Sequence, residues 1–202
     1  MKLYYTPGAC SLSPHIALRE AGLAFDLEQV NLQDKTTKSG ANYKAINPKG
    51  YVPALGLDNG EVLTEGAIIV QYIADLKPAS KLAPPAGTFE RVRLNEWLHF
   101  IATELHKGFG PINHPKATED LKQVFKERLT ARFQFLGDAV VGKSYLLGSG
   151  FTVADGYAYY TLRNWRKLVG PEFGGLAALR TYFDRVGQRE AVQAALAAEG
   201  LS

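Results

Sequence analysis

Hydrophobic and polar positions change their pattern once along the chain, near residue 77. Before that point, short apolar or alternating runs typical of strands take turns with stretches of helical spacing. We expect strands over 2–6, 25–31, 53–57 and 61–63, and helices over 11–21, 64–76 and part of the polar stretch 36–46. This order, β-α-β-α-β-β-α, predicts a small mixed sheet with helices packed on it.

The pattern after residue 87 is helical throughout. Apolar residues recur at helical spacing in five stretches, 94–105, 121–136, 154–168, 176–186 and 191–198. Thr152 followed by Asp155 is typical of a capping box at a helix start. Between the two patterns, KPASKLAPPAG holds three prolines and indicates a linker. We therefore expect an α+β domain at 1–77, a linker at 78–87 and an all-helical domain at 88–202.

Composition narrows the class of protein without identifying it. The chain has 202 residues, of which 46% are hydrophobic, enough for a real core. No apolar run reaches the ~18 residues of a membrane span, and no secretory signal is apparent. A net charge of +3 without a dense basic run argues against a nucleic-acid partner. With one cysteine, an internal disulfide is excluded, and we expect a cytoplasmic protein.

The single cysteine, Cys10, stands between the first expected strand and the first expected helix. Unpaired N–H groups and the dipole at a helix start stabilise an anion, which favours a reactive thiolate. A buried, inert cysteine is the other interpretation of this position. Cys10 to Ser13 form C-x-x-S, so no second cysteine can resolve a disulfide. A reactive Cys10 could therefore form only a mixed disulfide with an external thiol.

Tyr51-Val52-Pro53 offers a second kind of contact, with a peptide backbone. A cis bond before Pro53 would turn the backbone groups of Val52 outward, where an extended peptide could pair with them. An ordinary trans proline at a strand start is the alternative interpretation.

The stretch Thr64-Glu65-Gly66 offers a third contact, with an α-amino acid. Thr64 is expected to cap the helix, leaving N–H groups at Glu65 and Gly66 for a carboxylate and the Glu65 side chain for an ammonium group. Simple capping is the alternative. A ligand that combines a thiol, a peptide backbone and an α-amino acid is a cysteine-containing peptide, and glutathione fits this description.

Six stretches of the chain carry a resemblance to a known family: MKLYYTPGACSLSPHIALREAGL, NPKGYVPAL, LTEGAIIVQYIAD, ELHKGF, FTVADGY and AEGL. Together they resemble the bacterial beta class of glutathione S-transferases, whose members contain this cysteine. The resemblance implies a thioredoxin-like domain followed by an all-helical domain, a homodimer, and glutathione as cosubstrate without a metal. It also implies transfer of glutathione to small hydrophobic electrophiles, a detoxification and stress-response activity.

The resemblance assigns roles to particular residues. Cys10 would face the glutathione sulfur, and His106 would point toward the Cys10 thiol. The implied glutathione site consists of Lys35, Tyr51, Val52, Pro53, Glu65 and Gly66, completed by residues near 99 and 103, here His99 and Thr103, from the partner subunit. Phe109 and Trp165 are the expected electrophile pocket.

Helical spacing adds one expectation of its own about these residues. His99, Thr103 and His106 follow i, i+4, i+7 and should share a helix face. A buried core histidine is the alternative interpretation of His106.

Two positions depart from the family pattern. His99 stands where the family usually has Asn, which would add pH dependence to a glutathione contact. Asn164 stands where the family tends to have Trp; Trp165 follows, on the apolar stripe, so the electrophile pocket is expected to differ. The presence of Cys10 is compatible with two kinds of chemistry, conjugation of glutathione and thiol-disulfide exchange or peroxidase activity. A non-catalytic binding or regulatory protein of the same fold is the alternative from another class.

Overall fold

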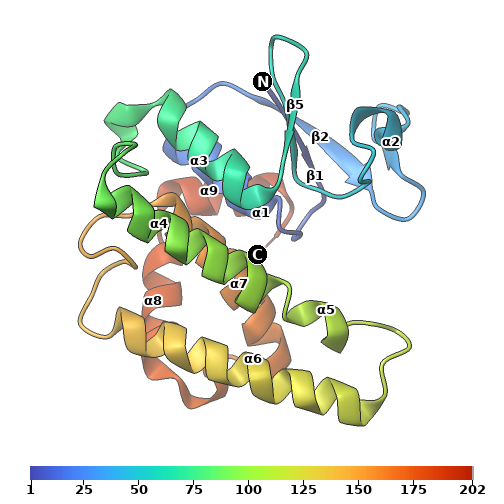
Figure 1. The fold of residues 1–202 in the computed structure, drawn as a ribbon. Coiled ribbons are helices and arrows are strands. Elements are labelled where there is room, and N and C mark those ends of the chain that lie inside the picture. Colours follow the sequence, from blue (N-terminus) through green and yellow to red (C-terminus); the bar gives the residue numbers. More distant parts are fainter. Residues whose placement is uncertain (202) are drawn as a thin grey trace. The chain divides into compact units, whose positions relative to one another are not determined.

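The structure is a computed structural model that describes residues 1–201 (Figure 1). Its contacts divide the chain into two compact units. The first, here called the sheet unit, comprises residues 1–83 and 187–202. The second, the helical unit, comprises residues 84–186. No helix of the described part of the chain is both long enough and apolar enough to cross a membrane.

The sheet unit is built on a mixed sheet of five strands in the order β3-β2-β1-β4-β5. The strands are β1 (Lys2–Tyr5), β2 (Asp26–Asn31), β3 (Thr36–Thr37), β4 (Ala54–Gly56) and β5 (Val62–Thr64). β1 runs parallel to β2, with Leu3 opposite Leu27, and antiparallel to β4, with Leu3 opposite Leu55. The other two pairs are antiparallel. The helix between β1 and β2 makes the parallel pair a βαβ unit.

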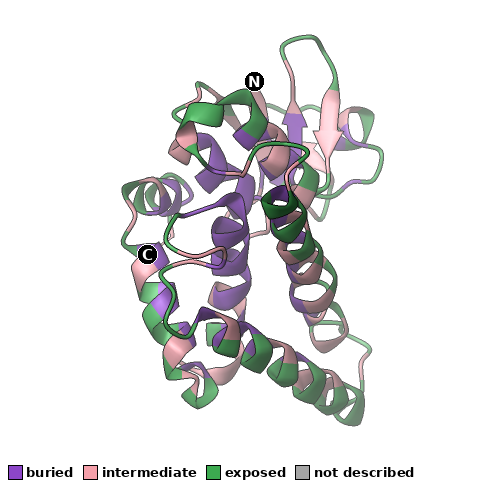
Figure 2. Ribbon diagram, turned by 60° about the vertical axis from the view of Figure 1, so that its left-hand side comes forward, coloured by how far each residue is buried: buried purple, intermediate pink, exposed green. Residues whose placement is uncertain are grey.

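Helices cover the sheet of this unit. They are α1 (Leu12–Glu20), α2 (Tyr43–Ile46), α3 (Gly66–Leu76) and α9 (Glu190–Ala198), and α1 packs against both α3 and α9. Leu3 is fully buried, whereas its neighbour Tyr4 packs against a separate cluster around Tyr43 and Val52. Because successive strand residues point to opposite faces, the sheet has a core on each side. Figure 2 shows the buried residues in purple along these elements.

The helical unit contains the other α-helices together with helices of two other types. They are α4 (Phe89–Phe100), a π-helical segment (Ile101–His106), α5 (Phe109–Ile112), α6 (Glu119–Val140), α7 (Val153–Val169), a 3-10 helix (Phe173–Gly175) and α8 (Ala177–Gly187). Helix α7 is the buried centre of the unit, because nearly every residue of its first three turns is inaccessible to solvent. This explains why its sequence carries the widest apolar stripe.

The expected capping box at the start of α7 is confirmed. The buried carboxylate of Asp155 accepts hydrogen bonds from the backbone N–H and the hydroxyl of Thr152, at 2.8 and 3.0 Å. Its other oxygen accepts from the Leu146 N–H and from the Tyr182 hydroxyl, at 2.8 and 2.6 Å. Burial raises the pKa of Asp155, and these four donors oppose that effect.

The predicted fold class is confirmed, with corrections in detail. The stretch 36–46 contains the short strand β3 as well as the expected short helix. The short helix α5 was not expected. A strand of two residues and a helix of four residues are too short to show a periodic pattern of apolar positions. The expected cap at Thr64 is wrong by one residue, because α3 begins at Gly66 and Glu65 is its N-cap.

The contacts divide the chain differently from the predicted boundary for the helical domain, which placed residues 88–202 together. Helix α9 lies in the sheet unit, where it packs against α1. Its apolar pattern indicates that it is buried but not what covers it. The partner of a helix depends on the path of the whole chain, which spacing within the helix does not encode.

Candidate functional site

Cys10 lies in a turn that leads from β1 into α1. Gly8 in this turn has φ +72°, a conformation that glycine adopts easily. The Ser11 hydroxyl closes the turn, because it accepts from the Thr6 N–H and donates to the Thr6 carbonyl, each at 3.2 Å. The backbone therefore holds Cys10, which is half-buried, at the start of α1.

The Cys10 thiol donates a hydrogen bond of 3.1 Å to the carbonyl oxygen of Val52. The Val52–Pro53 peptide bond is cis, as the resemblance implies. The Tyr43 hydroxyl and the Asn47 amide both donate to the Tyr51 carbonyl, at 2.7 and 2.8 Å, and hold this stretch in place. Cys10 and the Val52–Pro53 stretch, separate in sequence, are thus brought together. Only the thiol, and not the thiolate, can donate this bond.

Tyr51 is placed differently from Val52. Its side chain is 69% exposed, whereas Val52 is buried. Tyr51 therefore contributes its backbone carbonyl to the structure and leaves its ring at the surface.

Lys35 reaches the same loop from the other direction. Its backbone has φ +61°, and its ammonium group donates to the Gly50 carbonyl at 3.0 Å. Lys35 therefore lies beside the stretch that precedes Val52, to which the resemblance assigns it as part of the same glutathione site.

Glu65 and Gly66 lie where β5 passes into α3. The Glu65 backbone has φ +69°, and its carbonyl accepts from the N–H groups of Ile68 and Ile69. Its exposed carboxylate contacts the ammonium of Lys49, with Glu65 Oε1 and Lys49 Nζ 2.7 Å apart. An ideal Cβ at Gly66 would lie 3.7 Å from the Pro53 ring. Gly66 therefore passes close to the Val52–Pro53 stretch, and the carboxylate next to it already holds an ammonium group.

Lys49 and Tyr157 are residues that the sequence analysis did not select. Lys49 belongs to the quoted stretch NPKGYVPAL, but a lysine in a loop gives no signal for a particular partner. Tyr157 falls within the apolar stretch 154–168, and a residue at such a position is expected in the core. Its hydroxyl lies 2.8 Å from Nδ1 of His106.

His106 lies in the helical unit, in contact with α7. Its ring packs edge-on against Tyr157 and Tyr160, with centroids 5.8 and 5.2 Å apart. Burial, with a smaller contribution from Lys107, lowers the pKa of His106 to about 4. The imidazole is therefore neutral near pH 7. It can donate or accept a hydrogen bond there, but it supplies no positive charge.

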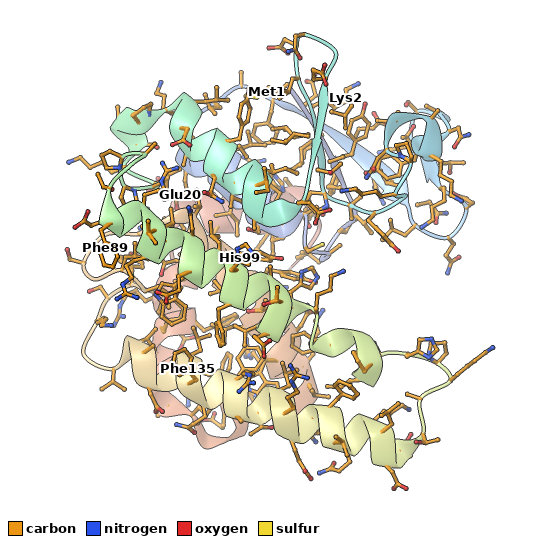
Figure 3. The ribbon with its side chains drawn as sticks, in the orientation of Figure 1. Met1, Lys2, Glu20, Phe89, His99 and Phe135 are labelled. Carbon is orange, nitrogen blue, oxygen red and sulfur yellow. The ribbon has the colours of Figure 1, made fainter. Side chains whose placement is uncertain are left out.

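His99, Thr103 and His106 do not share one helix face, contrary to the expectation from their spacing. His99, labelled in Figure 3, and Thr103 are exposed. The Thr103 hydroxyl donates to the His99 carbonyl at 2.9 Å. His106 is turned toward Tyr157 instead. The segment Ile101–His106 is π-helical, which changes the number of residues per turn and the spacing of a face. Such segments are frequent at functional sites, but a sequence period of 3.6 cannot anticipate them.

Phe109 and Trp165 lie in the core of the helical unit. Trp165 is 1% exposed and stacks on Phe133 with centroids 4.6 Å apart. Phe109 is also buried and contacts the same Phe133 ring, at 6.0 Å. These two residues pack the interior of the unit and expose little surface, 6% for Phe109 and 1% for Trp165. This geometry does not support the expected electrophile pocket. The burial of Trp165 agrees instead with its position on the apolar stripe of α7.

Comparison with known proteins connects these sites to one family. The family model described as the N-terminal domain of glutathione S-transferase matches residues 8–76. Glutathione S-transferase GstA of Escherichia coli O157:H7 is 44% identical over the full length of both chains. A sphingomonad glutathione S-transferase complexed with glutathione and a beta-class glutathione S-transferase of Sphingomonas chungbukensis each have a TM-score of 0.94, 44% identity and complete coverage of both chains.

Proposed function

The chain belongs to the glutathione S-transferase family and is a transferase, and we propose that it joins the thiolate of glutathione to small hydrophobic electrophiles. The observation that carries this proposal is the 3.1 Å contact of the Cys10 thiol with the Val52 carbonyl. It puts a thiol beside backbone groups that an extended peptide could pair with. The known complex of the sphingomonad relative with glutathione supports the same ligand.

Glutathione would bind with its three parts on three parts of the sheet unit. Its sulfur would lie near Cys10, its backbone along Val52, and its γ-glutamyl end at Glu65 and Gly66. The Glu65 carboxylate suits the γ-glutamyl ammonium, and the first N–H groups of α3 suit its carboxylate. Lys35 would attract the remaining carboxylate of the tripeptide.

Activation of the glutathione thiol requires groups that favour its thiolate. The N-terminal end of α1, near Cys10, supplies a partial positive charge. His106 would assist as a neutral hydrogen-bonding group, with its orientation set by the Tyr157 hydroxyl. When a ligand thiolate approaches, the Cys10 thiol can turn its hydrogen from the Val52 carbonyl to that sulfur. In this proposal, Cys10 stabilises the ligand as a thiol donor.

A second chemistry follows from Cys10 itself. The Cys10 thiolate would attack one sulfur of oxidised glutathione, forming a mixed disulfide and releasing the other half as a thiolate, which takes up a proton. The chain holds one cysteine, so this disulfide cannot be resolved internally. With oxidised glutathione alone, a second glutathione would only re-form the starting disulfide. If the Cys10 thiolate instead attacks the glutathione sulfur of a mixed disulfide between glutathione and another thiol, it releases that other thiol. One glutathione then returns the Cys10 thiol and leaves as oxidised glutathione, so the net reaction reduces the mixed disulfide. In this role the protein would be a thiol-disulfide reductase in oxidative stress.

We also propose a cytoplasmic homodimer in which His99 and Thr103 of the partner subunit border the glutathione site. Both residues are exposed within their own chain. Within the helical unit, the apolar side chains of Phe89 and Val92 on α4 are 65% and 55% exposed, which supports a partner surface on this helix. Sedimentation-velocity ultracentrifugation measures the oligomeric state directly.

The experiment that tests the main proposal is conjugation of glutathione to a chlorodinitrobenzene-type electrophile, followed above the uncatalysed rate. Wild type and Cys10→Ala are measured side by side. Turnover by both proteins shows that conjugation does not require the Cys10 thiol, whereas loss of turnover in Cys10→Ala shows that it does. A folded wild type that shows no turnover contradicts the proposal.

A further inference from the structure

We infer that Lys49 occupies the γ-glutamyl ammonium site of the unliganded protein and that glutathione must displace it. The inference rests on the proposed role of Glu65 and adds a residue that competes with the ligand for it. Lys49 would therefore set the affinity for glutathione without touching the reacting sulfur.

The contacts of Lys49 describe an ammonium site. Its Nζ atom lies 2.7 Å from Oε1 of Glu65 and 3.0 Å from the Thr64 hydroxyl oxygen. Two oxygen acceptors at these distances, one of them charged, are what the α-ammonium group of an amino acid requires. The same two acceptors cannot fully serve both ammonium groups, because like charges at this separation repel each other.

The backbone holds the acceptor side of this contact in place. Glu65 is the N-cap of α3 with φ +69°, and its carbonyl accepts from two N–H groups of the first turn of the helix. Thr64 ends β5, where its partner across the strand pair is Ala54. Glu65 and Thr64 are therefore positioned by the sheet and by α3, independently of Lys49. In contrast, Lys49 reaches them through a flexible side chain from a loop.

Exposure makes the displacement easy. The side chains of Lys49 and Glu65 are 51% and 67% exposed, so a ligand can reach the pair. Exposed ion pairs contribute little to stability, because water and salt screen them. A displaced Lys49 ammonium can be solvated at once. The contact is therefore weak enough to yield to a ligand that adds backbone and sulfur contacts.

Competition has a specific signature in ligand affinity. Removing the Lys49 charge should strengthen binding of glutathione by roughly two- to fivefold, the range expected for an exposed ion pair. It should leave unchanged the binding of glutaryl-cysteinyl-glycine, which lacks only the γ-glutamyl amino group. This analogue has no ammonium to compete with Lys49.

The test measures dissociation constants for both peptides by calorimetry, with wild type and Lys49→Met. Lys49→Arg keeps the charge and should bind as wild type does. Lys77→Met is the matched control, because Lys77 is also an exposed lysine of the sheet unit. The gain in Lys49→Met should shrink in 1 M salt, where the Debye length falls to about 3 Å.

Two outcomes separate this inference from the proposed function. Unchanged or weaker glutathione binding by Lys49→Met overturns the inference, and equal weakening for both peptides shows that Lys49 binds a carboxylate instead. Glu65→Gln tests the site itself, since it should abolish the preference for glutathione over the analogue. A preference that survives in Glu65→Gln overturns the assignment of Glu65, whatever Lys49 does.

Discussion

The Nδ1 atom of His15 lies 2.8 Å from Oε1 of Glu199, and both side chains are fully buried. The second Glu199 oxygen accepts the N–H of Gly8 at 2.9 Å, in the turn before Cys10. Arg19 donates to the other ring nitrogen of His15, at 2.9 Å, so the ring donates to Glu199. One carboxylate at the end of α9 thus connects α1 with the Cys10 turn.

Glu199→Ala is expected to destabilise the protein by about 3 to 5 kcal/mol, because it leaves buried donors of His15 and Gly8 without an acceptor. Urea unfolding measures the change. Glu172→Ala is the control: Glu172 pairs with Arg180 at the surface, with side chains 67% and 54% exposed. That pair should contribute at most about 1 kcal/mol. Equal losses of unfolding free energy in Glu199→Ala and Glu172→Ala would contradict the claim that burial makes the Glu199 contacts more stabilising.

His106 should make stability depend on pH. Its pKa is about 4 in the folded protein and 6.5 when unperturbed, so the unfolded chain binds the proton first on acidification. Stability contributed by neutral His106 is complete above pH 6.5. It falls by about 1.4 kcal/mol per pH unit below that value and is lost near the folded pKa.

The measurement for His106 is urea unfolding of wild type and His106→Gln between pH 7 and pH 5. The difference in unfolding free energy between the two proteins should change across this range, because glutamine does not titrate. His99→Gln is the matched control, since the same change is made there at an exposed histidine. A difference that is the same at every pH would contradict a lowered His106 pKa.

Trp165 should behave as a core residue. Trp165→Ala is expected to lower stability by about 3 to 5 kcal/mol through loss of its stack on Phe133. Trp165→Phe keeps an aromatic ring and should lower it less, leaving KM for the electrophile unchanged. A changed KM in folded Trp165→Phe, measured with the electrophile varied at saturating glutathione, would restore Trp165 to the electrophile pocket.

Cys10 should take up one glutathionyl group from oxidised glutathione. The half-buried thiol at the start of α1 is reachable by a small disulfide, and its reaction should accelerate as pH rises, because the thiolate is the nucleophile. Intact mass before and after reduction with dithiothreitol measures the adduct. Cys10→Ser, which lacks the only thiol, is the control. An unchanged wild-type mass would exclude the redox role.

Sequence alone predicted the α+β domain, the helical second half and the capping box at Thr152 and Asp155. Periodicity and capping are local, so residues a few positions apart determine them. The quoted stretches around Cys10, Val52 and Glu65 also indicated the ligand class through their resemblance to a family. The thiol and the helix start needed no long-range information to be selected, whereas the residues around Pro53 left a trans bond open and only the resemblance implied the cis form.

Only the tertiary structure decided which of these groups have partners. The Cys10 thiol contacts Val52, Glu65 contacts Lys49, and Glu199 contacts His15 across most of the chain length. Such pairs form between segments that are distant in sequence. The spacing of residues within one helix or strand therefore does not predict them. The burial that lowers the His106 pKa and encloses Trp165 depends on neighbouring helices in the same way.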